Sequence, residues 1–152
     1  LNPAPLTGQL MGVYDGNLIE TVGDVLLNLG LERAMVVHGD DGLDEITTTT
    51  TTTVCEVKNG KLYKYILNPS DYGIELCKPE ALVGGTPNDN AKIIVDILKG
   101  KGGPKRDIVV LNTGAALYVA KVVDSLKDGI KLARDLIYSG KAYDKYLELR
   151  SA

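Results

Sequence analysis

Four carboxylates are concentrated in one short segment that follows an apolar run at 34–37. They belong to Asp40, Asp41, Asp44 and Glu45, and glycines lie among them. Like charges this close together repel one another unless a positive group neutralises them. An oxygen-ligated cation such as Mg²⁺ fits the pattern, because it binds one or two protein carboxylates and completes its shell with water and substrate phosphates. The segment is therefore a candidate metal site.

The same segment also has a purely structural interpretation. Asp-Asp-Gly turns are common on protein surfaces, where their carboxylates are solvated. His38, at the end of the apolar run, can act as a general base or contact a phosphate, but a single histidine is more often structural. The residues by themselves leave both interpretations open.

Three further segments carry groups that can bind anions. The run Thr47–Thr53 offers hydroxyls to a phosphate, although β-branched residues fit an extended strand equally well. The turn Gly84-Gly85-Thr86-Pro87-Asn88 precedes a predicted helix, whose N-terminus favours anions, but it lacks the lysine and spacing of a P-loop. A basic cluster surrounds a glycine-rich linker, and such clusters are usually solvated. Its members are Lys99, Lys101, Lys105 and Arg106.

Hydrophobic periodicity predicts the elements that position these groups. A strand is expected over 9–14, a helix from Leu18 to Leu29 that ends at Gly30, and a second strand over 34–37. This strand–helix–strand unit predicts parallel pairing through a right-handed crossover. The acidic segment then leaves the carboxyl end of the second strand, where open α/β sheets bind ligands.

The rest of the chain is expected to form a hairpin followed by helices. Asn59-Gly60 separates two alternating runs, 54–57 and 62–67, and is a strong hairpin signal. Helical patterns follow near 93–98, 105–121, 126–137 and 143–147. The fold class predicted is α/β, with a mostly parallel sheet, flanking helices and a β-hairpin.

Composition limits the classes of protein that remain. The 152 residues are 44% hydrophobic and 24% charged, which is typical of a globular domain. No apolar run approaches the roughly 18 to 20 residues that span a bilayer, and no signal peptide is recognisable, so no membrane partner is expected. A net charge of −3 without Trp or Phe argues against nucleic acid. Cys55 and Cys77 lack CxxC spacing and are interpreted as packing residues of a reduced, cytoplasmic protein.

Several segments occur in a specific order along almost the whole chain, and together they resemble a known family. They are Leu1-Asn2-Pro3-Ala4, Gly12-Val13-Tyr14, Val36-Val37-His38-Gly39, Gly42-Leu43-Asp44-Glu45-Ile46, Gly84-Gly85-Thr86-Pro87 with Asn90-Ala91, and Gly100-Lys101 through Arg106-Asp107 to Asn112-Thr113 and Ala115-Ala116-Leu117-Tyr118. The pattern is similar to the C-terminal portion of the anthranilate phosphoribosyltransferase family. The resemblance implies a large domain of the nucleoside phosphorylase/phosphoribosyltransferase type.

The resemblance also implies an activity and a metal site. The family transfers the phosphoribosyl group of phosphoribosyl pyrophosphate to the amine of anthranilate in tryptophan biosynthesis, and pyrophosphate leaves. The family uses Mg²⁺, and its adjacent Asp-Glu pair ligates one ion. That pair falls on Asp44 and Glu45 of this chain. The resemblance assigns no role to His38 or to the basic cluster.

Motifs of the family that lie upstream of Leu1 are not in these 152 residues. They are a Gly-Thr-Gly-Gly-Asp phosphate motif, a Lys-His-Gly-Asn segment, an arginine that contacts anthranilate, and the helical N-terminal domain through which the family homodimerises. The expectation is a fragment, 1–152, that forms one α/β unit with an exposed sheet edge and is inactive alone. Gly114 stands where the family commonly has Ala, which should cost about 0.5–1 kcal/mol in a helix interior.

Two other functions are compatible with parts of this pattern. A pyrimidine-nucleoside phosphorylase shares the broad fold and a ribosyl-transfer chemistry. A non-catalytic binding module that has lost the active half is the alternative outside enzymes. The match through Asn112-Thr113 and 115–118 favours the transferase.

Overall fold

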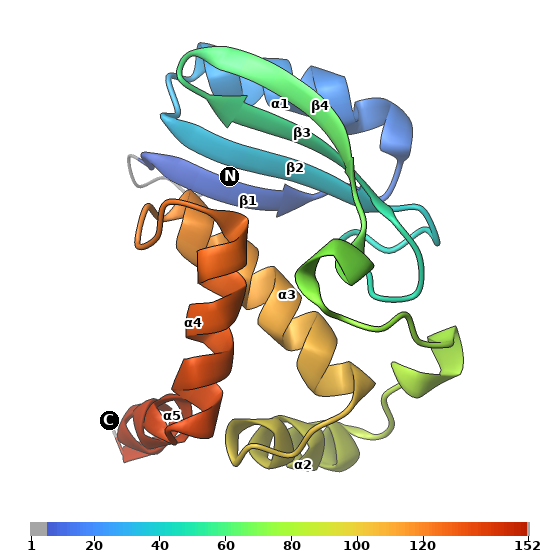
Figure 1. Ribbon diagram of the computed structural model, residues 1–152, viewed down its shortest axis with the longest axis vertical. Coiled ribbons are helices and arrows are strands. Elements are labelled where there is room, and N and C mark those ends of the chain that lie inside the picture. Colours follow the sequence, from blue (N-terminus) through green and yellow to red (C-terminus); the bar gives the residue numbers. More distant parts are fainter. Residues whose placement is uncertain (1–5, 152) are drawn as a thin grey trace.

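The computed structural model describes residues 6–151, in which a four-stranded sheet lies against a group of helices (Figure 1). The strands follow one another across the sheet in chain order: β1 (Gly8–Gly12), β2 (Arg33–Gly39), β3 (Thr52–Lys58) and β4 (Lys61–Leu67). The first matching segment, Leu1–Ala4, lies outside the described residues. β1 and β4 are the edge strands of the described sheet.

The α/β class is confirmed, but the expectation of a mostly parallel sheet is wrong. Only β1 and β2 pair in parallel, through the crossover helix α1 (Ile19–Asn28), whereas β2–β3 and β3–β4 are antiparallel. A parallel pair needs a long crossover, and only the first connection contains a helix. The segment that joins β2 to β3 returns the chain in the opposite direction without a helix.

Two predicted chain reversals are confirmed by backbone geometry. Gly30 follows α1 with φ of +80°, the left-handed conformation that ends many helices. Asn59 and Gly60 have φ of 53° and 69°, which is the positive pair required by a type I′ hairpin turn. The register Lys58↔Lys61 then places β3 and β4 side by side.

Four longer helices make up the second half of the chain: α2 (Pro87–Leu98), α3 (Pro104–Val119), α4 (Leu126–Tyr138) and α5 (Lys141–Ser151). Short 3-10 turns are η1 (Gly16–Leu18), η2 (Pro69–Tyr72) and η3 (Pro79–Ala81). Thr86 caps α2 by a reciprocal capping box with Asp89. The Gly84–Asn88 turn is therefore a helix entry.

β2 is buried on both faces and separates two apolar clusters. Ala34 and Val36 face α1, together with Cys55 of β3, whereas Met35 and Val37 face α3 and α4. This alternation follows from the two-residue period of a strand. Cys55 is buried, and burial together with the charges of nearby acids raises the pKa of its thiol, which favours a packing role.

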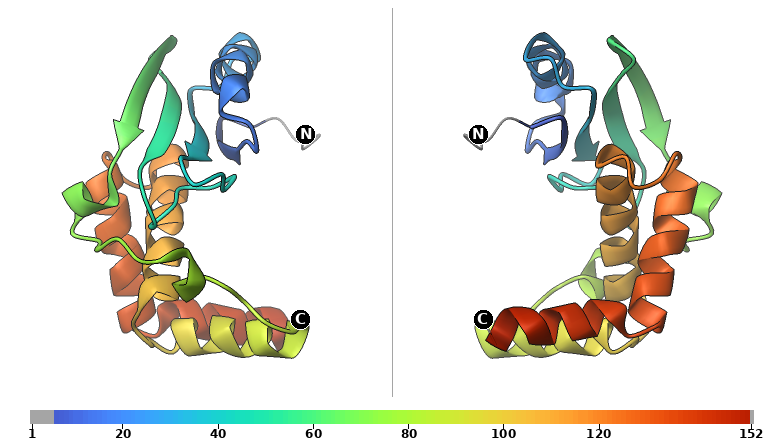
Figure 2. Two further views of the ribbon diagram at one scale, coloured as in Figure 1. Left: turned by 90° about the vertical axis from the view of Figure 1, so that its right-hand side faces the viewer. Right: turned by 90° about the vertical axis from the view of Figure 1, so that its left-hand side faces the viewer.

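In side view the molecule is bracket-shaped (Figure 2). The sheet with α1 forms one arm, α2 and α5 form the other, and α3 and α4 connect them. The segment between β2 and β3, which carries the carboxylates, lies on the inner side of the bracket. Within residues 6–151, no helix has the length and apolar character needed to cross a membrane.

Candidate functional site

The threonine run holds the first two carboxylates of the acidic loop. Asp41 accepts hydrogen bonds from the hydroxyls of Thr47, at 2.6 Å, and of Thr49. Asp40 accepts hydrogen bonds from Thr51 and, at 2.9 Å, from Thr53. Of the two interpretations left open for the run, the strand applies only to its last two residues, because β3 begins at residue 52. Four of the seven candidate hydroxyls, those of Thr47, Thr49, Thr51 and Thr53, instead bind these two carboxylates.

These hydrogen bonds keep Asp41 ionised. Partial burial acts to raise the pKa of its carboxyl, but the Thr47, Thr49 and backbone hydrogen bonds outweigh burial and hold the pKa below its usual value. The loop also closes on itself through the Gly39 N–H, which donates to the Leu43 carbonyl at 2.8 Å. Asp40 and Asp41 thus form a structural half of the loop.

Asp44 and Glu45 form the other half, and both residues are exposed. The ion pairs among residues 6–151 all use other acidic side chains. Partial burial raises the pKa of Glu45, and the negative charges of Asp44 and Asp41 raise it further. The three carboxylates therefore share one region of negative potential, which a cation would relieve.

The backbone around this pair is held from two sides. At the end of β1, a Cβ placed on Gly12 would lie 1.5 Å from the Asp44 carbonyl oxygen, so only glycine fits there. On the other side, the Asn112 amide of α3 bonds both backbone groups of Ile46, with the Ile46 N–H at 3.0 Å and the Ile46 carbonyl at 2.8 Å. The carboxylate pair is therefore carried by constrained backbone, although it lies in a loop.

A mostly apolar cavity of about 340 Å³ adjoins Glu45. Its walls come from the acidic loop, the segment after η3, α2 and α3, and include Leu43, Leu82, Ile94 and Val109. Among the described residues, no group of three or more His, Cys, Asp or Glu side chains is arranged to hold a metal. A pair of carboxylates nevertheless fits Mg²⁺, which takes one or two protein ligands and fills the rest of its shell from water and substrate.

His38 has a structural contact. Its Nδ1 lies 2.8 Å from the Val13 carbonyl oxygen, and because a carbonyl only accepts, Nδ1 carries the proton. The ring also lies against Gly16, where an added Cβ would be 3.2 Å from the imidazole. Of the two interpretations left open for this histidine, the structure favours the structural one.

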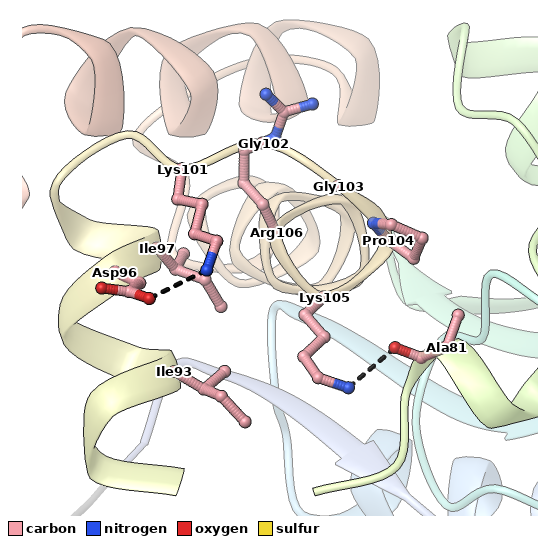
Figure 3. A pocket seen from close by; sticks show the side chains of 10 residues that line it. All are labelled: Ala81, Ile93, Asp96, Ile97, Lys101, Gly102, Gly103, Pro104, Lys105 and Arg106. Atoms are coloured by element: carbon pink, nitrogen blue, oxygen red, sulfur yellow. Dashed lines mark hydrogen bonds and ion pairs between the residues drawn. The ribbon is translucent and has the colours of Figure 1, made fainter. Parts of the chain in front are cut away.

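The basic cluster also makes intramolecular contacts (Figure 3). Lys105 Nζ donates to the carbonyls of Ala81 and Val83, at 2.7 Å each, and Lys101 forms an ion pair with Asp96 at 3.0 Å. The Arg106 guanidinium bonds Asp107 and the Tyr138 hydroxyl. Lys99 lies 5.1 Å from the centre of the Tyr143 ring. These contacts give the cluster a structural role where α2 ends and α3 begins.

Sequence comparison places the chain in a family. Residues 1–143 match the glycosyl transferase family, a/b domain, and the chain belongs to this family. Among curated relatives, it is similar to the anthranilate phosphoribosyltransferases of Clostridium beijerinckii, at 63% identity, and Methanobrevibacter smithii, at 49%. The alignments cover 99% and 97% of this chain but only 44% and 45% of those proteins. The chain thus spans less than half the length of these relatives.

Solved structures agree in fold. The anthranilate phosphoribosyltransferase of Thermus thermophilus superposes with a TM-score of 0.87 at 37% identity, over 99% of this chain and 45% of that one. The Saccharomyces cerevisiae enzyme, solved in complex with PRPP and Mg, superposes with a TM-score of 0.83 at 27% identity, over 95% and 42%. The same yeast enzyme has been solved with 4-fluoroanthranilate. The chain therefore has the phosphoribosyltransferase fold.

Sequence reasoning singled out Asp44 and Glu45 but not the residues that hold them. Gly12 and Asn112 appear there only as parts of longer matching segments. A signal for Asn112 was present, because asparagine is a poor helix former and its presence inside an apolar helix needs a reason. No comparable signal distinguishes Gly12 from any other glycine at the end of a strand, since the backbone that it contacts, at Asp44, is far away in sequence.

Proposed function

We propose that this chain is the C-terminal part of an anthranilate phosphoribosyltransferase. It would act, with the upstream part of the protein, in transferring phosphoribosyl from phosphoribosyl pyrophosphate to anthranilate in tryptophan biosynthesis. The observation that carries the proposal is an exposed, backbone-constrained Asp44–Glu45 pair at the carboxyl end of β2, in a chain similar to these enzymes along nearly its whole length. The nucleoside phosphorylase and the binding module are not favoured, since the relatives named above are anthranilate phosphoribosyltransferases.

Asp44 and Glu45 are the residues that we propose to hold Mg²⁺. When bound, the ion would neutralise negative charge on the departing pyrophosphate. Asp44 and Glu45 would fix the position of the ion, and without it the acidic loop would repel that anion. Asp40 and Asp41, already bound by threonine hydroxyls, would keep the loop in one conformation.

The proposed role of the chain alone is limited. Residues 1–152 would form one α/β unit, and the phosphate motif, the anthranilate contact and the dimer-forming helical domain would come from upstream. We therefore expect the isolated chain to be inactive. Two carboxylates position a metal but supply no donors for the ribose 5-phosphate and no acceptor site.

The test is loss of anthranilate fluorescence with phosphoribosyl pyrophosphate and Mg²⁺. It uses this chain alone and this chain completed by the upstream part of the Clostridium beijerinckii relative, which is 63% identical in the shared region. Activity is expected only in the completed protein. Turnover by the chain alone would show that our account of the missing groups is wrong.

Asp44→Asn and Glu45→Gln, introduced into the completed protein, test the metal assignment. Each change should lower kcat/KM by about 10²-fold or more and raise the Mg²⁺ concentration required, because a lost ligand charge weakens transition-state stabilisation. Glu75→Gln, an exposed acid outside the acidic loop, is the control. Activity equal to wild type in both loop variants would remove these residues from the site.

A further inference from the structure

Asn112 is the polar residue that connects α3 to the acidic loop. Its Oδ1 accepts the Ile46 N–H at 3.0 Å, and its Nδ2 donates to the Ile46 carbonyl at 2.8 Å and to the Ile108 carbonyl at 3.0 Å. Ile46 is fully buried and directly follows Glu45. One amide thus satisfies both backbone groups of a buried residue, with no bond from a β-ladder or a helix.

Few side chains can replace this amide. A carboxylate has acceptors only, so aspartate would keep the bond from the Ile46 N–H and lose the bond to the Ile46 carbonyl. Leucine or alanine would lose both bonds and leave two buried backbone groups unpaired, which costs free energy for each group. The loop would then have to move to recover partners from solvent.

The position of this contact matters because the loop is also held on its opposite side. Gly12 lies against the backbone of Asp44, where a Cβ would be 1.5 Å from the carbonyl oxygen. Asp44 therefore lies against β1, and the residue after Glu45 is bound to α3. A shift at Ile46 moves Glu45 directly, since the two residues share a peptide bond.

We propose that Asn112 is a positioning residue, which holds Asp44 and Glu45 in the arrangement that binds a divalent cation. This inference rests on the function proposed above and adds a residue to it. Asn112 acts through the Ile46 backbone, so its loss should reduce cation affinity without removing a ligand. Residues that orient metal ligands are often worth about 10- to 100-fold in affinity or activity.

The experiment compares Asn112→Ala and Asn112→Asp with Thr113→Ala. Thr113 is the exposed neighbour of Asn112 on the same helix, so its variant controls for a general effect on α3. Mn²⁺ is the probe, and its binding is followed by electron paramagnetic resonance in the completed protein with phosphoribosyl pyrophosphate. Hydrogen exchange of the Ile46 amide is measured in parallel in the same proteins.

We expect Asn112→Ala to weaken Mn²⁺ binding by about tenfold or more and to accelerate exchange of the Ile46 amide. Asn112→Asp, which keeps the bond from that N–H, should leave exchange slow and still weaken Mn²⁺ binding. It therefore decides the question if the alanine variant fails to fold. Thr113→Ala should match wild type in both measurements.

Wild-type Mn²⁺ affinity in both Asn112 variants, together with weakened binding in Glu45→Gln, would show that the amide does not position the pair. The metal assignment of the proposed function is contradicted by a separate outcome. If Asp44→Asn and Glu45→Gln both leave Mn²⁺ binding unchanged, the cation is held elsewhere and this inference falls with that assignment.

Discussion

At the scale of single residues, the acidic loop contains carboxylates in two different states. The Asp41 carboxylate accepts hydrogen bonds from two threonine hydroxyls and a backbone N–H, and these bonds lower its pKa. Glu45 lies beside an apolar cavity and near other negative charges, and its pKa is raised. One carboxylate therefore stabilises the fold when ionised, whereas the other destabilises it. Such a difference is typical of a site in which one group is structural and another is available to a ligand.

Asp41→Asn should destabilise the chain by about 1 kcal/mol near neutral pH, because the amide replaces a charged acceptor of two hydroxyls. The folded-state pKa of Asp41 is lowered, so its contribution is present above the ordinary value of 3.8 and is lost as pH falls. Urea unfolding at about pH 7 and about pH 3 measures this difference. A destabilisation of equal size at both pH values would contradict the role of the charge.

Glu45→Gln should have the opposite effect in metal-free protein. A raised folded-state pKa favours folding below the ordinary value of 4.5, and that contribution is lost as pH rises. Near neutral pH the variant should be more stable by a few tenths of a kcal/mol, the scale expected for exposed, screened charges. Thermal unfolding with Glu75→Gln as control measures this. A less stable variant would mean that Glu45 has a stabilising partner.

At the scale of elements, a close backbone contact joins α3 to α4. A Cβ on Gly129 would lie 2.2 Å from the Gly114 carbonyl oxygen, and a Cβ on Gly114 would lie 2.7 Å from the Ile130 nitrogen. Gly114 was expected only to weaken its helix. The structure shows that the two glycines let these helices approach each other. This contact fixes the position of α3, which carries Asn112 to the acidic loop.

Gly129→Ala should destabilise the protein by about 1–3 kcal/mol, because the added methyl group meets backbone that can move only with a whole helix. Chemical denaturation measures the loss. Gly102→Ala is the matched control, since its Cβ would meet only the flexible end of Arg106, at 3.2 Å. Equal stability of the Gly129 variant and wild type would contradict the close packing of α3 and α4.

At the scale of the whole molecule, one buried carboxylate connects the sheet to the helices. Glu56 of β3 is 8% exposed and accepts hydrogen bonds from Tyr65 of β4, at 3.1 Å, and from Tyr118 of α3. Arg33 lies over the Tyr118 ring, 4.5 Å from its centre, and donates to the Tyr118 carbonyl at 2.8 Å. Burial raises the pKa of both phenols, and their hydrogen bonds to Glu56 act in the same direction.

The fold should therefore lose stability in alkali. Tyrosines in the unfolded chain ionise near about pH 10, but Tyr65 and Tyr118 retain their protons when folded, so the unfolding free energy falls as pH rises above that value. Tyr65→Phe should reduce this fall by up to about 1.4 kcal/mol per pH unit. Urea unfolding at several alkaline pH values measures it. The exposed Tyr14→Phe is the control, and an unchanged slope in Tyr65→Phe would contradict the assignment.

Local features, whose cause lies within a few residues, could be predicted from the amino-acid order alone. Gly30 and Asn59-Gly60 each impose a backbone conformation through their own chemistry, and the structure has both as expected. The turn 84–88 leads into a helix, also as expected. The antiparallel direction of the β2–β3 pair is not local. It depends on where the chain runs between β2 and β3, and strand propensity alone predicts that the threonine run there is extended. Thr47, Thr49 and Thr51 lie outside the strand and bind Asp41 and Asp40, and strand propensity does not predict these side-chain hydrogen bonds.

The candidate site divides in the same way. Asp44 and Glu45 are proposed as metal ligands from residue type, spacing and a family resemblance, because clustered carboxylates attract cations. Their supports come only from the packed molecule: Gly12 contacts Asp44, and Asn112 bonds Ile46 across 66 residues of sequence. Such contacts depend on how the sheet and α3 pack. The glycine and the amide support the loop only because this packing brings the loop backbone next to them. The sequence by itself thus supplied the carboxylates proposed to bind a metal, and the tertiary packing decided which residues hold their backbone.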